Sequence, residues 1–131
     1  MFKKNKNTQN VQLNKFDTLV GTNTMIEGIL KDEGTIRIDG EVKGEVMVKG
    51  DVFLGESGTI TGNISGTNII IAGKILGNVE ALEQLHISST GNLTGDICVN
   101  SFIVDENAFF EGKCKMINQK ERNNTINENE V

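Results

Sequence analysis

Apolar residues alternate with other residues along most of the chain, and a motif of apolar residue, any residue and glycine recurs six times. The six copies are Ile26-Glu27-Gly28, Val42-Lys43-Gly44, Ile60-Thr61-Gly62, Ile75-Leu76-Gly77, Leu93-Thr94-Gly95 and Phe110-Glu111-Gly112. The sequence numbers of successive glycines differ by 16, 18, 15, 18 and 17. Because side chains of a strand point alternately to opposite faces, this alternation predicts β-strands. The period is too short for a repeated helix pair, which takes roughly 34–47 residues.

A second set of apolar pairs lies between the glycine motifs and keeps the same period. Each pair places two apolar residues two positions apart, at Ile36/Ile38, Val52/Leu54, Ile69/Ile71, Leu85/Ile87 and Phe102/Val104. The sequence numbers of successive pairs differ by 16 or 17, whereas the segment from a pair to the next glycine motif varies in length. We therefore expect an all-β solenoid with three strands per coil, about five to six coils, and length variation confined to one turn.

The inward Ile, Val and Leu side chains of such a solenoid stack from coil to coil and form its core. The repeated glycine also lies at an inward position, so we expect a corner at which a side chain would not fit or φ must be positive. Left-handed β-helices keep a strict six-residue repeat, so the drift of the glycine spacing between 15 and 18 favours a right-handed coil.

The two ends of a solenoid expose open strand edges, and no convincing helix or loop is predicted to cap them here. The last coil is instead rich in large apolar side chains, and we predict a polymerisation interface formed by Phe102, Phe109, Phe110 and Met116. Two interpretations stay open. The phenylalanines plug the end of the core, or the coil stacks on the same surface of a second molecule, and both can hold at once. Two uncapped ends would produce filaments rather than closed dimers.

Composition and charge limit the kinds of partner and the cell compartment that we expect for this chain. The chain has 15 glycines and no proline, which favours short strands joined by turns of Gly, Asn, Asp and Ser. Residues 16–117 carry seven basic and fifteen acidic side chains, a net charge of −8 that argues against a nucleic-acid partner, whereas residues 1–15 contain four lysines and no acid. No secretory signal or membrane-spanning apolar run is visible, so we expect a cytoplasmic chain with reduced thiols.

Candidate reactive groups are few. His86 lies between two inward residues, so we expect it at the surface and not as a metal ligand. Cys98 is expected outside and Cys114 inside, which argues against a disulfide. No catalytic, metal or cofactor site is predicted. The alternative is a trimeric β-helix enzyme of the acyltransferase kind with a catalytic histidine, against which the drifting period and the absence of extra loops argue.

On these features the chain resembles the bactofilins, a family of bacterial cytoskeletal proteins. The likeness covers residues 16–117 and rests on the glycine-spaced rungs and on a closing string. That string is Asn107-Ala108-Phe109-Phe110-Glu111-Gly112-Lys113-Cys114-Lys115-Met116. In the family this position reads approximately Gly-Ala-x-Phe-x-Gly with a Met four residues on. Here Asn107 replaces the leading glycine, and asparagine also tolerates positive φ.

The resemblance implies a right-handed triangular β-helix that assembles head to head and tail to tail into non-polar filaments, without nucleotide. It implies that Phe110 matches the aromatic residue of the last coil on which assembly depends. It also implies a short N-terminal peptide that holds filaments on the inner face of the cytoplasmic membrane, here Met1-Phe2-Lys3-Lys4. We expect residues 1–15 and 118–131 to be disordered tails on either side of the β-helix domain.

The leading hypothesis is therefore a non-enzymatic scaffold that polymerises with itself, binds the membrane surface and needs no cofactor. Its expected work is to organise cell shape or to hold partners such as cell-wall enzymes or other scaffold proteins. One Phe and one Met in a membrane contribute about 2–4 kcal/mol, so a monomer would bind weakly and a filament firmly through its many copies. A further possibility is a membrane-surface adaptor that stays monomeric.

Overall fold

The computed structural model describes residues 16–117, which form thirteen β-strands and contain no helix. The strands are β1 (Thr18–Val20), β2 (Met25–Asp32), β3 (Ile36–Ile38), β4 (Glu41–Val48), β5 (Asp51–Leu54), β6 (Thr59–Thr61), β7 (Ile64–Ile71), β8 (Lys74–Leu76), β9 (Val79–Ile87), β10 (Asn92–Thr94), β11 (Ile97–Val104), β12 (Phe109–Glu111) and β13 (Cys114–Met116). All pairings between them are parallel, as a solenoid requires. The predicted tails, residues 1–15 and 118–131, lie outside the described residues.

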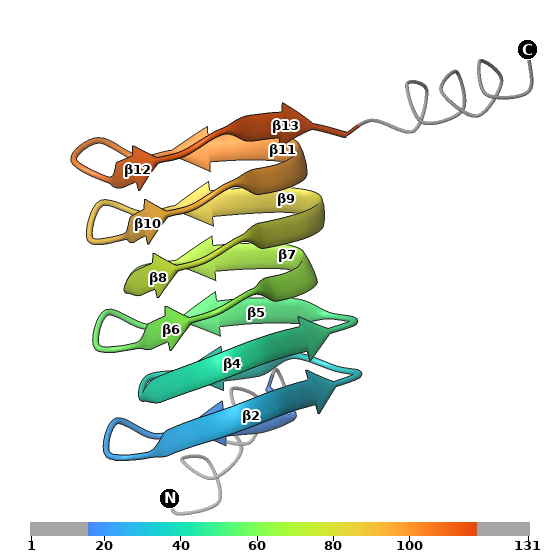
Figure 1. Ribbon diagram of the computed structural model, residues 1–131, viewed down its shortest axis with the longest axis vertical. Coiled ribbons are helices and arrows are strands. Elements are labelled where there is room, and N and C mark those ends of the chain that lie inside the picture. Colours follow the sequence, from blue (N-terminus) through green and yellow to red (C-terminus); the bar gives the residue numbers. More distant parts are fainter. Residues whose placement is uncertain (1–15, 118–131) are drawn as a thin grey trace, which may run out of the picture.

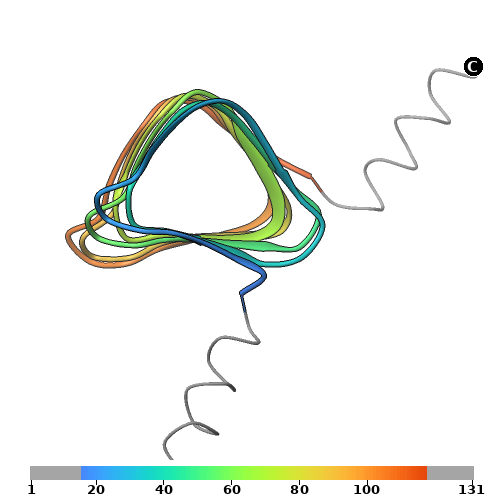
Figure 2. The same ribbon diagram turned by 90° about the horizontal axis from the view of Figure 1, so that it is seen from below.

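The chain winds into six stacked coils with a triangular cross-section (Figures 1 and 2). In Figure 1 strands such as β4 run from left to right in front, and β5, β7, β9 and β11 return behind them while the chain climbs. This is a right-handed coil. The all-β solenoid, its number of coils and its right-handed triangular form are thus confirmed.

The core is a stack of aliphatic side chains in register. The second apolar ladder of the sequence is one continuous column, in which Ile36 pairs with Val52, Val52 with Ile69, Ile69 with Leu85, and Leu85 with Phe102. The first four side chains are at most 1% exposed. No polar or charged residue is buried in the described part of the chain. Each aliphatic side chain contributes about 1.5–3 kcal/mol when fully buried, so stacking stabilises every coil through its neighbours.

The repeated glycine turns the chain at a corner where two backbones touch. All six motif glycines have positive φ, between 131° and 150°. A Cβ atom on Gly77 would fall on the carbonyl oxygen of Gly62, one coil below. The prediction of a corner that excludes side chains and requires positive φ is therefore confirmed. Asn107 has φ 74°, so it adopts the conformation inferred for it from the closing string.

The number of residues per coil varies at a second place as well as in the predicted turn. Strand β9 contains a bulge, and it pairs in register with β7 and β11 before and after the bulge. Ala81 pairs with Gly66 and Gln84 with Asn68, so β9 has one more residue between these pairs than β7 has. The expectation that variation is confined to one turn is wrong. The extra residue is accommodated because Leu82 turns outward, where it is 52% exposed, and the inward ladder continues unbroken at Leu85.

We predict that Gly77→Ala lowers the free energy of unfolding by at least about 1–3 kcal/mol, because alanine is strained at this φ and its methyl group meets a backbone oxygen. Denaturant unfolding followed by circular dichroism measures the change. Gly21→Ala is the control, since the nearest atom to its new Cβ is Thr24 Oγ1 at 3.9 Å. Equal stability of the two variants would contradict the role of the corner.

Candidate polymerisation interface

The C-terminal end of the solenoid presents the inward side of its last coil with no further coil above it in the described chain (Figure 1). Phe102 lies one coil above Leu85, Phe110 above Leu93 and Met116 above Val99. Val104 and Cys114 continue the same inward columns above Ile87 and Ile97. We call these five residues, Phe102, Val104, Phe110, Cys114 and Met116, the C-terminal end face.

Exposure distinguishes this end face from the same positions in the coils below. Leu85, Leu93 and Val99 are each 0% exposed, because the next coil covers them. Met116 is 47% exposed and Val104 is 44% exposed. Positions that belong to the core in earlier coils are therefore at the surface here, and the surface has the shape and chemistry of a coil interior.

The two inward phenylalanines partly close the core. Their rings meet edge to face, with centroids 5.4 Å apart and an interplanar angle of 74°. Both are half-buried and pack on the aliphatic core. This geometry is the one that the plugging interpretation requires. It leaves apolar surface beside the rings, so stacking on a second molecule remains compatible with it.

Of the four residues predicted for the interface, Phe109 is placed apart from the others. It pairs in register with Asn92, points outward and is 46% exposed on a flank of the solenoid. The end face contains Phe102, Phe110 and Met116, and sequence reasoning missed Val104 and Cys114. Their inward alternation with Phe102 and Met116 was the signal that could have found them.

The N-terminal end is built differently. Its inward positions are Thr18, Val20, Ile26, Leu30 and Asp32, which pair with Ile36, Ile38, Val42, Val46 and Val48. Asp32 Oδ1 accepts a hydrogen bond of 2.7 Å from the Gly34 N–H, and Asp32 Oδ2 is buried without a partner. The C-terminal face contains no polar oxygen at these positions, so the two ends are unlike.

Both ends also leave strand edges unpaired within the described residues. Strands β1 and β2 pair only with β3 and β4, and β12 and β13 pair only with β10 and β11. Each of these four outer strands therefore has one edge whose backbone N–H and C=O groups lack a strand partner. Such edges are templates for pairing with another chain.

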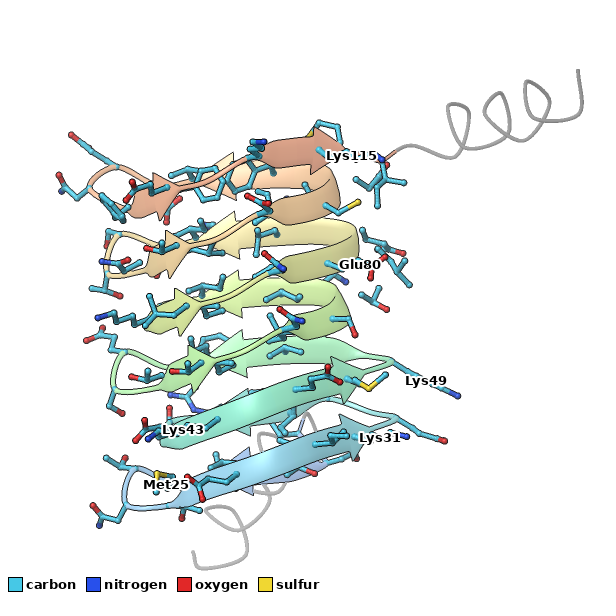
Figure 3. All side chains as sticks on the ribbon, viewed as in Figure 1. Met25, Lys31, Lys43, Lys49, Glu80 and Lys115 are labelled. Carbon is cyan, nitrogen blue, oxygen red and sulfur yellow. The ribbon has the colours of Figure 1, made fainter. Side chains whose placement is uncertain are left out.

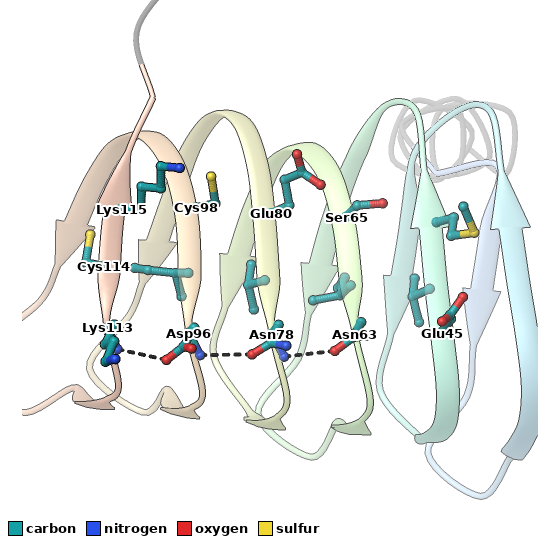
Figure 4. Close-up of a pocket in the computed structure, with 15 residues that line it drawn as sticks. Glu45, Asn63, Ser65, Asn78, Glu80, Asp96, Cys98, Lys113, Cys114 and Lys115 are labelled. Atoms are coloured by element: carbon teal, nitrogen blue, oxygen red, sulfur yellow. Dashed lines mark hydrogen bonds between the residues drawn. The ribbon is translucent and has the colours of Figure 1, made fainter. Parts of the chain in front are cut away.

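A polar ladder runs beside a groove of about 810 Å³ along one flank (Figure 4). The Asn78 N–H donates to Asn63 Oδ1 at 3.2 Å, and the Asp96 N–H donates to Asn78 Oδ1 at 3.1 Å. The Lys113 N–H donates to Asp96 Oδ1 at 3.1 Å. These residues each follow a corner glycine, so their side chains satisfy backbone donors that the turn leaves without a ladder partner.

Histidine and the thiols lie where the alternation placed them. His86 is on a different flank from the groove, and its Nε2 lies 2.9 Å from Asp105 Oδ1 with the side chain 33% exposed. Cys98 points outward and Cys114 lies over Ile97, and both thiols are free. Within residues 16–117 no cluster of three potential metal ligands occurs, and no helix there is long and apolar enough to cross a membrane.

Most charged side chains lie on the flanks of the solenoid, and Asp32 at the N-terminal end is the exception described above. In Figure 3 the lysine side chains at positions 31, 43, 49 and 115 and Glu80 all point away from the solenoid. The closest Lys–Glu pair, Lys49 Nζ and Glu33 Oε2, is 3.9 Å apart and almost fully exposed, so it contributes little stability. The structure is therefore held by backbone pairing and apolar stacking.

A comparison with known families decides the identity. Residues 18–115 match the family Bactofilin, described as polymer-forming cytoskeletal. The chain belongs to the bactofilin family. The resemblance inferred from the closing string and the rungs is thereby confirmed.

Two curated bactofilins of Myxococcus xanthus are similar to this chain. BacP is 29% identical over 100 residues, which are 76% of this chain and 42% of BacP. BacO is 28% identical over 106 residues, which are 81% of this chain and 83% of BacO. The chain therefore spans less than half of the length of BacP and most of the length of BacO.

Two solved structures of Thermus thermophilus bactofilin share the fold at 28% identity. One is a cryo-EM reconstruction of double helical filaments, with a TM-score of 0.72, covering 74% of this chain and 96% of that one. The other is the crystal structure of a phenylalanine-to-arginine mutant, with a TM-score of 0.64, covering 66% of this chain and 97% of that one.

The thiol on the end face of this bactofilin provides a test of its local environment. Burial raises the pKa of Cys114, and the neighbouring Cys98 raises it further. Cys98→Ser removes the second cause, so we predict that alkylation of Cys114 by iodoacetamide begins at lower pH in the variant. Peptide mass spectrometry measures the alkylated fraction of Cys114 across a pH series. Both proteins carry Phe110→Arg, so that contacts between end faces do not shield the thiol. An unchanged midpoint would show that the two sulfurs do not interact.

Proposed function

We propose that this bactofilin polymerises without nucleotide by stacking its solenoid ends and forms a non-enzymatic, membrane-associated scaffold. The observation that carries the proposal is the C-terminal end face, which no further coil covers within residues 16–117. Its five side chains continue inward columns that are fully buried one coil below. A second solenoid end supplies what the next coil would supply, namely apolar cover and a strand to pair with.

The two ends contribute unequally to such a filament. The C-terminal face buries only apolar groups and sulfur, whereas the N-terminal face brings the carboxylate of Asp32 and the hydroxyl of Thr18 to the contact. Burying a carboxylate without a partner is costly. We therefore assign the stronger contact to the C-terminal end, where Phe102 and Phe110 supply the largest side chains.

Membrane attachment is proposed through Met1-Phe2-Lys3-Lys4, which lie outside the described residues. The support is their composition, because each lysine near an anionic surface adds roughly 1 kcal/mol and Phe2 and Met1 add apolar burial. A filament presents many copies of this weak anchor, so polymerisation and binding are coupled. The scaffold then lies on the inner face of the cytoplasmic membrane and organises cell shape or positions cell-wall enzymes or other scaffold proteins.

The enzyme alternative has no supporting geometry. An acyltransferase-like site needs a histidine beside a groove, and the groove of the described chain is lined by Asn, Asp, Glu, Lys, Ser and Cys together with apolar side chains. His86 is hydrogen-bonded to Asp105 on another flank. Negative-stain microscopy separates the classes, because the scaffold forms filaments and the enzyme forms discrete trimers.

We predict that Phe110→Arg moves the protein from pellet to supernatant on sedimentation, because it places an uncompensated charge on the end face. A loss of about 1.4 kcal/mol in the contact already raises the concentration needed for assembly tenfold. Phe109→Arg is the matched control, since that neighbouring side chain points to a flank. Filaments of Phe110→Arg, or a wild-type chain that stays monomeric at every concentration, would refute end-to-end stacking.

We also predict that Phe2→Ser filaments lose binding to anionic liposomes in a flotation assay, whereas Phe2→Leu filaments keep it. Each subunit loses the free energy of burying one apolar side chain in the membrane, and this loss is repeated for every subunit of the filament. Phe110→Arg should float poorly as well, because a monomer lacks the multiple anchors. Unchanged flotation of Phe2→Ser would remove the N-terminal peptide from the proposal without affecting polymerisation.

A further inference from the structure

The N-terminal end of the solenoid holds a carboxylate at a position that belongs to the core in later coils. Asp32, at the end of β2, lies directly below Val48, which is 6% exposed. The Gly34 N–H donates to Asp32 Oδ1 at 2.7 Å, and Oδ2 is buried with no partner among residues 16–117. Because a buried charge without a partner is costly, a donor for this oxygen is expected from outside these residues.

The strand edge beside Asp32 is also open. The second half of β2 pairs upward with β4 and has no strand below it in the described chain (Figure 1). Its inward residue Leu30 is half-buried, whereas Val46, one coil above, is 1% exposed. One more strand on this flank would therefore cover Leu30, pair the free backbone edge and reach the carboxylate.

The winding of the coil brings the chain's own N-terminal segment to this edge. Leu30 and Asp32 lead into Ile36, and Ile36 lies directly above Thr18. With the same winding one coil lower, the residues that lead into Thr18 would lie below Leu30 and Asp32. These residues are the last part of the segment 1–15, which precedes the described chain.

Later coils show how many residues separate this flank from the next one. The step from the last inward residue of this flank to the first inward residue of the next is either three or four positions. It is three from Gly66 to Ile69 and four from Val48 to Val52, and all four residues are buried. Only these two steps occur in the described coils, so two registers are available to the segment before Thr18.

Only one of the two registers matches the end of the solenoid. A step of four places polar glutamine and asparagine side chains inward. A step of three, counted back from Thr18, places Lys15 below Asp32 and Leu13 below Leu30. An aliphatic side chain then covers an aliphatic one, and an ammonium group meets the carboxylate. The match in both packing and charge favours this register.

We propose that residues 12–15 form an additional strand on the open edge of β2, and we call these residues the cap strand. Its Leu13 side chain packs on Leu30. Its Lys15 ammonium donates to Asp32 Oδ2. The inference deepens the proposed function, because it concerns which end of the solenoid stays open for stacking.

Other donors fit the buried oxygen less well. Lys31 precedes Asp32 and Lys49 follows Val48, but both lysine side chains point away from the solenoid (Figure 3). Lys49 instead lies 3.9 Å from Glu33 Oε2. A second molecule stacked on this end would bring another Asp32 to the contact, which adds a like charge. The chain's own Lys15 is the cation that the register places at the oxygen.

The same count at the other end of the solenoid predicts no strand there. Continued from Met116, a step of three places Gln119 and Glu121 inward, and a step of four places Lys120 and Arg122 inward. Either register would bury charge against the apolar end face, which is costly. The chain's own sequence can therefore extend the N-terminal end and not the C-terminal end.

The cap strand changes what the N-terminal end offers to a second molecule. One flank is already paired, and the carboxylate has its partner within the same chain. The edges of β1 and of the first half of β2 stay open. The disordered tail expected from the sequence is then limited to residues 1–11. Stacking at this end has fewer free edges, so the stronger contact stays at the C-terminal end.

The test is hydrogen exchange of backbone amides, measured by NMR on the full chain with Phe110→Arg to prevent C-terminal stacking. We expect the paired amides of residues 12–15 to exchange at least about tenfold more slowly than those of residues 3–10. Leu13→Ser should remove this protection, because the strand loses its contact with the core. Val11→Ser is the matched control, since it changes an apolar residue that precedes the cap strand.

The charge pair is tested in the same assay by a double-mutant cycle. Lys15→Gln should raise exchange of the cap strand at least about tenfold, because it leaves Asp32 without its partner. Added to Asp32→Asn, the same change should have no further effect. Lys6→Gln is the matched control and should leave exchange unchanged. A full effect of Lys15→Gln in the Asp32→Asn chain would overturn the assignment of Asp32 as the partner.

The outcomes separate this inference from the proposed function. Unprotected residues 12–15, or protection that survives both Leu13→Ser and Lys15→Gln, would overturn the cap strand and leave end-to-end stacking intact. Protection that rises with protein concentration would identify a second copy as the cover and overturn it too. An equal loss of protection in the control variants would show that register does not matter, with the same consequence. Failure of the unmodified chain to sediment would instead refute the proposed function.

Discussion

Each coil of this bactofilin is completed only by its neighbours. A single coil encloses one layer of Ile, Val and Leu, and its backbone groups pair with the coils above and below. Such a layer cannot exclude water by itself, because its two faces are open along the axis. The fold is therefore stable only as a stack, and within residues 16–117 the first and last coils each have a neighbour on one side only.

The corner glycines and the polar ladder serve this stacking directly. Backbones at the glycine corners approach so closely that a Cβ atom has no place, and the side chains that follow accept hydrogen bonds from the coil above. The bulge in β9 adds a residue without moving the inward column. An extra residue in a coil thus turns outward, where it alters the surface of a flank and leaves the inward column in register.

The proposed function rests on the end face that no further coil covers within residues 16–117. The apolar end face continues the core, so the interaction that builds one molecule is also available to join two. The described chain offers little else: its reactive side chains are a surface histidine paired with Asp105 and two separate thiols. The two ends of the solenoid present different side chains, apolar groups and sulfur at the C-terminal end and Thr18 and Asp32 at the N-terminal end.

The sequence alone determined the solenoid, its parallel register, the positive φ of its corners and the apolar character of its last coil. Each of these depends on spacing and alternation, which act over a short stretch of chain and repeat. Only the tertiary structure decided that Phe102 and Phe110 meet edge to face and that Arg37 stacks on Phe53. These neighbours belong to different coils or to different strands of one coil, so they are distant from one another in the sequence. Their contacts depend on where each coil turns and on which faces no further coil covers, and alternation along one strand does not contain that information.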